Sequence, residues 1–141
     1  MMLTPVLLAA NDTPEQGLSP TQPYVAVGKD VSGQNFDSAN LELANFSGAT
    51  AERASFRNAS LAYANLSIAK LNGADLTGAN LKFALIEYTE LENAVGLTPA
   101  QLAEACIPKA TEEEKLMVEG FDPVAYKQPE GCLIWEHVPR G

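Results

Sequence analysis

The sequence predicts a solenoid, because one short pattern recurs through its middle. An apolar or small residue stands at every fifth position, and these central residues are Phe36, Leu41, Phe46, Ala51, Phe56, Leu61, Leu66, Leu71, Leu76, Leu81, Ile86 and Leu91. Two positions before nearly every central residue stands an alanine, from Ala39 to Ala84. Neither an α-helix, with its period of about 3.6, nor a strand, with its period of about 2, keeps a five-residue repeat on one face. Such a repeat indicates units that bury their apolar residues by stacking on one another.

The repeat also resembles a known family. Ala39-Asn40-Leu41, Ala64-Asn65-Leu66 and Ala74-Asp75-Leu76-Thr77-Gly78 are similar to the A(N/D)LXX unit of pentapeptide-repeat proteins. The resemblance implies that four units make one square turn, which gives an all-β solenoid: a right-handed quadrilateral β-helix of about three coils from twelve pentapeptides. The units depart from the pattern at Gln34, Ala51, Lys70, Leu85, Thr89 and Glu90.

In the fold that the resemblance implies, the central residue and the residue two before it point inward. Residues twenty apart then stack, so that Leu61 lies between Leu41 and Leu81. An interior filled in this way offers no ligand cavity. This expectation argues against an enzyme.

Four segments follow along the chain. We expect an apolar N-terminus and flexible linker over residues 1–33, the β-helix over 34–94, a helical cap over 95–120 and an irregular tail over 121–141. Within the linker, Tyr24 to Val27 could add one short strand.

Outside the repeat, the clearest sequence signals are those of the helical cap. Thr98-Pro99-Ala100-Gln101 forms a capping box with proline at the first helical position. An apolar stripe of Leu97, Leu102, Ala105 and Cys106 follows, and Pro108 should end this helix. Thr111 to Glu114 predicts the start of a second helix that runs to Gly120.

Composition and charge narrow the possible partners. The chain has 141 residues, 18 acidic and 9 basic, for a net charge of −9. Contacts to phosphate groups need clustered Lys and Arg, so nucleic acid is not expected as a direct ligand. The apolar stretch over residues 1–10 is too short to span a membrane and lacks the basic start of a signal peptide. We expect a cytoplasmic protein, or one exported to the periplasm or a lumen if that stretch is a truncated signal peptide.

The two cysteines, Cys106 and Cys132, both lie outside the repeat. They could form a disulfide that joins the tail to the cap, or remain two buried thiols. The single histidine, His137, leaves no set of four ligands for zinc. No catalytic constellation, cofactor motif or metal site is recognised, and the protein is not expected to be an enzyme.

Large apolar side chains gather at two sets of outward positions. Two places after the central residue, one column contains Leu43, Tyr63 and Phe83, and the next contains Ile68 and Tyr88. An exposed patch of this kind usually marks an interface, with a protein partner or with a second copy of the chain. The alternative is that a terminal segment folds back over it.

The sequence therefore predicts a non-enzymatic scaffold or protein–protein interaction module of unknown process. The alternative comes from the family resemblance: some members resemble DNA in shape and charge and regulate DNA-binding enzymes such as topoisomerases. That mimicry requires a long acidic rod, whereas the repeat here is short and carries a net charge of only −3, from seven acids and four bases over residues 34–94.

Overall fold

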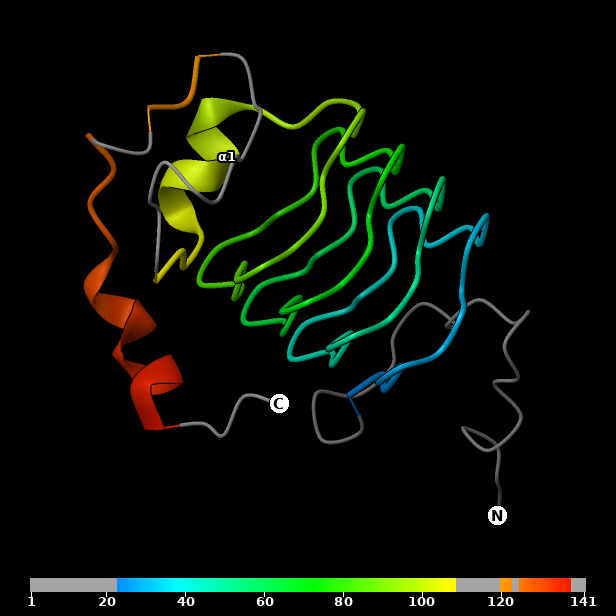
Figure 1. Ribbon diagram of the computed structural model, residues 1–141, viewed down its shortest axis with the longest axis horizontal. Coiled ribbons are helices and arrows are strands. Elements are labelled where there is room, and N and C mark those ends of the chain that lie inside the picture. Colours follow the sequence, from blue (N-terminus) through cyan, green and yellow to red (C-terminus); the bar gives the residue numbers. More distant parts are fainter. Residues whose placement is uncertain (1–22, 109–119, 123–124, 138–141) are drawn as a thin grey trace.

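The computed structural model describes residues 23–108, 120–122 and 125–137. These residues form a right-handed quadrilateral β-helix, as predicted. The coils follow one another along the stack from blue to yellow-green in Figure 1. The helix α1 (Pro99–Glu104) and the 3-10 helix η2 (Glu130–His137) both lie at the C-terminal end of this stack.

Parallel β-bridges hold the coils together, and all but the last, Leu85↔Cys106, join a residue to the one twenty positions later. They recur in steps of five, from Val25↔Asn45 to Asp75↔Val95. The backbone N–H of Leu61, for example, donates to the carbonyl of Asn80 at 2.8 Å in the next coil. Within a coil, the N–H of Ala64 donates to the carbonyl of Leu61 at 3.0 Å and closes the turn between two faces.

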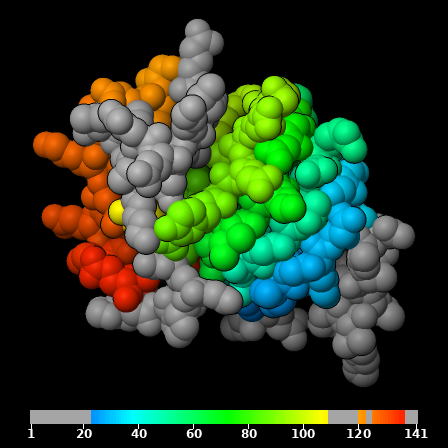
Figure 2. Space-filling model, viewed as in Figure 1, coloured from blue at the N-terminus to red at the C-terminus, as the bar shows by residue number. Residues whose placement is uncertain are grey.

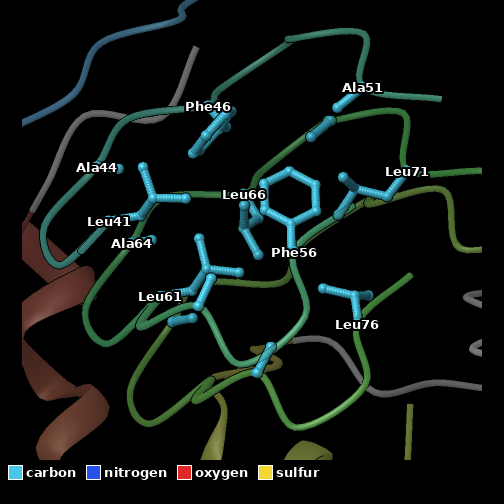
Figure 3. Close-up of a cluster of buried hydrophobic side chains, with 14 of the residues drawn as sticks. Leu41, Ala44, Phe46, Ala51, Phe56, Leu61, Ala64, Leu66, Leu71 and Leu76 are labelled. Carbon is cyan, nitrogen blue, oxygen red and sulfur yellow. The ribbon is translucent and has the colours of Figure 1, made fainter. Parts of the chain in front are cut away.

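The central residues and the alanines before them fill the interior, as Figure 3 shows. Leu41, Leu61 and Phe56 are fully buried, and the rings of Phe36 and Phe56 stack with their centroids 4.9 Å apart. Alanine suits its position because the chain bends there beside a large Leu or Phe. The five-residue phase assigned from the sequence therefore describes the core.

The Asn or Asp before the central residue has a specific structural role. Its side-chain oxygen accepts a hydrogen bond from the backbone N–H two residues later, for example Asn65 from Ser67 at 2.9 Å and Asp75 from Thr77 at 3.0 Å. This Asx-type bond stabilises the start of each turn. The A(N/D)LXX pattern thus records both the packing of the core and the geometry of the turns.

The expected linker over residues 1–33 is wrong for its last ten residues. Val25 and Asp30 take part in the ladder, and Ala26 and Val31 are buried as central residues of two further units before Phe36. Tyr24 is buried at the alanine position and packs its ring 5.6 Å from that of Phe36. Among the described residues the first coil has a neighbouring coil on one side only, so the small-residue rule is relaxed there. The N-terminal stretch over residues 1–10 lies outside the described residues.

The C-terminal cap differs from the prediction in its length. α1 begins with the predicted capping box at Thr98, but it ends at Glu104, because Ala105 is already extended. Cys106 returns to the ladder above Leu85, where its N–H donates to Ala84 at 2.8 Å and its carbonyl accepts from Ile86 at 2.8 Å. The tail over 121–141 is not wholly irregular, since it contains η2. The predicted second helix over 111–120 lies outside the described residues except for Gly120.

Candidate interaction surface

The residue two positions after each central residue turns the corner of the square and has a positive φ. Nine of these corner residues are not glycine. A bulky side chain in this left-handed region is unusual and costs about 1 kcal/mol or more, because its Cβ crowds the backbone. Two of the four corners nevertheless carry large apolar residues. We call Leu43, Tyr63 and Phe83 the first apolar corner, and Ile68 and Tyr88 the second apolar corner.

The other two corners are built differently. Their residues are glycine, polar or charged: Ser38, Asn58 and Gly78 on one, and Gly33, Arg53, Gly73 and Asn93 on the other. Glycine and asparagine adopt positive φ with little strain. The fold therefore does not itself require large apolar groups at a corner.

Several members of the apolar corners are open to solvent. Leu43 is 45% exposed, Ile68 is 50% exposed and Tyr88 is 55% exposed. Tyr63 and Phe83 are half-buried, with their rings 5.1 Å apart. The two corners border one face of the β-helix, because the chain passes from the first to the second within each coil.

The face between the two corners is a flat polar strip in the middle coils. The hydroxyls of Ser47 and Ser67 lie 3.3 Å apart in successive coils, and Asn65 accepts from both the N–H and the hydroxyl of Ser67. These groups satisfy one another, so the strip is already hydrogen-bonded before anything binds. The large apolar side chains on this side of the molecule stand at its two borders.

Phe83, predicted to be an open member of the first corner, instead lies against the C-terminal tail. A Cβ placed on Gly131 of η2 would lie 2.6 Å from Cζ of the Phe83 ring, so only glycine allows this approach. The indole Nε1 of Trp135 donates to the Phe83 carbonyl at 2.9 Å. The alternative in which a terminal segment folds back thus describes Phe83, whereas Leu43 keeps the exposure expected of an open surface.

The two cysteines meet at this contact. Cys106 and Cys132 are joined by a disulfide with their Cα atoms 5.5 Å apart, and both are buried. They share a small apolar cluster with Leu85 and Trp135, against which Phe83 packs. This burial explains why Leu85 stands where the earlier coils of the same column have Asn45 and Asn65. The sequence left the pair open between a disulfide and two thiols, and the structure contains the disulfide.

Other side chains from outside the repeat satisfy backbone groups near the last rung. Gln101 of α1 donates to the carbonyls of Leu76 at 2.9 Å and Ala79 at 3.0 Å. The hydroxyl of Tyr126 donates to the Ala105 carbonyl and accepts from the Ile107 N–H at 3.2 Å. Burial raises the pKa of Tyr126, so this hydroxyl keeps its proton. Such contacts limit further strand pairing at this end.

The polar sides carry mixed charge. Arg57 pairs with Asp75 at 3.1 Å, and its backbone N–H donates to Asp37. Hydrogen bonds from Thr77 lower the pKa of Asp75, with a smaller contribution from Arg57. On the next face, Lys70 stacks between Thr50 and Glu90. Charges of both signs therefore share these columns.

The described residues show neither a metal cluster nor a membrane-spanning helix. Within 23–108, 120–122 and 125–137, no group of three or more His, Cys, Asp or Glu side chains is arranged to hold a metal ion. No helix in that part of the chain is long and apolar enough to cross a bilayer.

These features define a capped β-solenoid with two apolar corners. Residues 39–78 match the family model described as pentapeptide repeats, in eight copies. This part of the chain is thus a run of pentapeptide repeats. It matches none of the curated proteins searched.

The chain is similar to solved structures of pentapeptide-repeat proteins. A pentapeptide-repeat protein from the thylakoid lumen of Arabidopsis thaliana is 25% identical over 84% of this chain and 97% of its own, with a TM-score of 0.37. HetL from the cyanobacterium Nostoc sp. strain PCC 7120, involved in the regulation of heterocyst differentiation, is 25% identical over 58% of this chain and 42% of its own, with a TM-score of 0.27. Rfr23 from the cyanobacterium Cyanothece 51142 is 26% identical over 50% of this chain and 48% of its own, with a TM-score of 0.31. The chain thus spans less than half the length of HetL and Rfr23.

Proposed function

We propose that this protein is a non-enzymatic interaction module that binds another protein, or a second copy of itself, through its two apolar corners. One observation carries the proposal. Leu43 and Ile68 hold large apolar side chains in the left-handed region and expose about half of each to water. Both the conformation and the exposure are unfavourable for the isolated chain.

Equivalent corner positions in other coils and at other corners have glycine in place of a large apolar residue. Gly48 occupies the same corner as Ile68 one coil earlier, and Gly73 occupies a polar corner with no apolar group at all. Glycine would remove the backbone strain at Leu43 and Ile68 and would give up only the half of each side chain that is buried. Large apolar side chains at these positions carry both backbone strain and exposed apolar surface. A contact made outside the chain accounts for them best.

Mimicry of DNA has less support. A mimic needs columns of like charge along the rod, whereas Arg57 lies between Asp37 and Asp75, and Lys70 between Thr50 and Glu90. Binding through apolar corners also predicts weak dependence on salt, while a DNA mimic should release its partner as ionic strength rises.

The test replaces corner residues without straining the backbone. The double variant Leu43→Asn, Ile68→Asn keeps residues that tolerate positive φ and removes the apolar surface. Ser38→Asn with Arg53→Asn makes the same change at the two polar corners and serves as the matched control. Each protein is immobilised for capture from an extract of its native host, sedimented alone to detect self-association, and melted.

We expect the apolar-corner variant to lose its partner or its self-association while it melts at the same or a higher temperature. The control should bind as the wild type does. Binding that survives in the apolar-corner variant, or that falls equally in both variants, would contradict the proposal.

We also propose that the protein acts in an oxidising compartment, such as a periplasm or a lumen, and not in the cytoplasm. The buried Cys106–Cys132 disulfide supports this, because such bonds form and persist mainly outside the reducing cytosol. Trapping thiols by alkylation during lysis of the native host should leave both cysteines unlabelled. Full labelling of the folded protein would place it in a reducing compartment.

A further inference from the structure

We infer that η2 is a cover over the upper end of the first apolar corner, and that the Cys106–Cys132 disulfide latches this cover shut. The oxidised protein then presents Leu43 and part of Tyr63, while reduction also opens the surface at Phe83. This inference rests on the proposed function for its biological meaning. Its test measures the cover itself and can fail separately.

The cover is held by contacts confined to one place. Gly131 lies against the Phe83 ring, Trp135 donates to the Phe83 carbonyl, and Cys132 bonds to the last rung of the ladder at Cys106. These contacts all belong to the small cluster around Leu85, separate from the main core. Displacing η2 would therefore disturb this cluster and leave the packing of the coils in place.

The helix itself is a weak local structure. A 3-10 helix of eight residues is long for its type, because its hydrogen bonds are poorly aligned and its side chains eclipse. Its outward side exposes Leu133 and Ile134, at 57% and 46%, so only part of its apolar surface is used in docking. A segment of this kind belongs to the low-stability end of a fold and depends on its tertiary anchors.

The redox step is a thiol–disulfide exchange with a dithiol reductant. One reductant thiolate attacks a sulfur of the Cys106–Cys132 bond, and a mixed disulfide forms as the S–S bond breaks. The second reductant thiolate then displaces the protein sulfur. Two electrons pass to the protein, two protons end on its cysteines, and the reductant leaves as its own disulfide. Because both sulfurs are buried, the attack requires η2 to lift first, which couples reduction to opening.

The chain carries a built-in reporter for this movement. Trp135 is its single tryptophan and is buried in the docked cover. We would treat the full chain with dithiothreitol, confirm two free thiols per chain, and follow tryptophan emission, acrylamide quenching and far-ultraviolet circular dichroism. We expect a red shift of the emission and a severalfold rise in quenching, with the β-helical dichroism unchanged.

Two variants separate the latch from the packing. The double variant Cys106→Ser, Cys132→Ser should show the open signal without reductant and no response to it. Gly131→Ala should open the contact in the oxidised protein by displacing η2 from Phe83, whereas Gly28→Ala adds the same methyl group where nothing lies within 4 Å and should leave Trp135 buried.

The outcomes are decisive in both directions. A buried Trp135 after complete reduction would show that packing alone holds η2 and would overturn the inference. Loss of the β-helical dichroism together with the tryptophan signal would also overturn it, because the disulfide would then support the whole fold. If reduction gives the open tryptophan signal while the Leu43→Asn, Ile68→Asn variant binds as the wild type does, the cover exists but the proposed function fails.

Discussion

The sharpest test of the architecture compares one chemical change at two positions that differ only in phase. Leu61 is a central residue of the middle coils and has no exposed surface. Figure 3 shows it among the side chains of the interior, with Leu41 and Leu66. Leu43, two positions after a central residue, is 45% exposed at a corner. Leu→Ala removes the same atoms at both sites. The difference between the two costs therefore measures burial.

The magnitudes follow from the packing. Leu61→Ala loses the transfer free energy of the side chain and leaves a cavity between rigid coils, which together cost about 3 kcal/mol, within a usual range of about 2–5. That loss is large against a total stability of about 5–15 kcal/mol. Leu43→Ala loses a side chain already half in water and leaves no cavity, so we expect about 0.5 kcal/mol. Alanine also keeps the strain at positive φ, so the backbone term does not change.

The assay is urea unfolding followed by circular dichroism, with the slope of the transition compared between variants. We expect Leu61→Ala to lower the midpoint clearly at nearly constant slope, and Leu43→Ala to leave it almost unchanged. Costs that agree within about 0.5 kcal/mol would refute the assignment of inward and outward positions.

Three further predictions concern the cap and the polar face. Gly96→Ala should cost about 2 kcal/mol in urea unfolding, because Gly96 has φ +73° and its new Cβ would lie 2.7 Å from the backbone of Thr77; Gly28→Ala, strained but unobstructed, should cost about half as much. Tyr126→Phe leaves two backbone groups without their partner and should cost about 1–2 kcal/mol and raise amide exchange at the last rung; unchanged exchange would argue against its role. Because the folded pKa of Asp75 lies below its ordinary 3.8, its carboxylate stabilises the protein above that pH and loses this effect as pH falls through the folded value. Asp75→Asn should therefore flatten the acid loss of melting temperature, and an identical acid profile would refute this.

The fold can be predicted from the sequence where each coil packs between two neighbouring coils. There the interior position must be small or apolar to fit, so the repeat from Phe36 to Ile86 can be recognised from residue types alone. The signal fades at the first coil, where Tyr24 and Lys29 stand in place of alanine. Tyr24 packs on Phe36 and Lys29 is exposed, and within the described part of the chain neither has a coil on both sides. Asp30 directly before the central Val31 keeps the Asn/Asp part of the pattern, and it accepts the Asx-type bond from the Ser32 N–H at 3.0 Å.

The candidate surface could be predicted only in part. Periodicity alone identifies which residues face outward, and Leu43 and Ile68 are exposed as expected. It cannot show that η2 reaches Phe83, or that Cys132 meets Cys106, because both depend on the path of a tail that has no repeat. Two local signals did exist: Leu85 breaks the Asn/Asp rule where the cover lies, and Gly131 precedes Cys132.

The contacts of the cap also restrict how a partner can approach. Gln101 and Tyr126 occupy backbone groups near the last rung that would otherwise pair with a further strand, and α1 lies across the end of the stack. Growth of the sheet from this end would break these bonds before any new ones formed. The apolar corners lie on the side of the stack and require no such displacement. Figure 2 shows the successive coils as adjacent coloured stripes along the side of the stack that faces the viewer. Self-association through the apolar corners needs no change at this end of the stack, so Leu43→Asn with Ile68→Asn should abolish it while Tyr126→Phe leaves it intact.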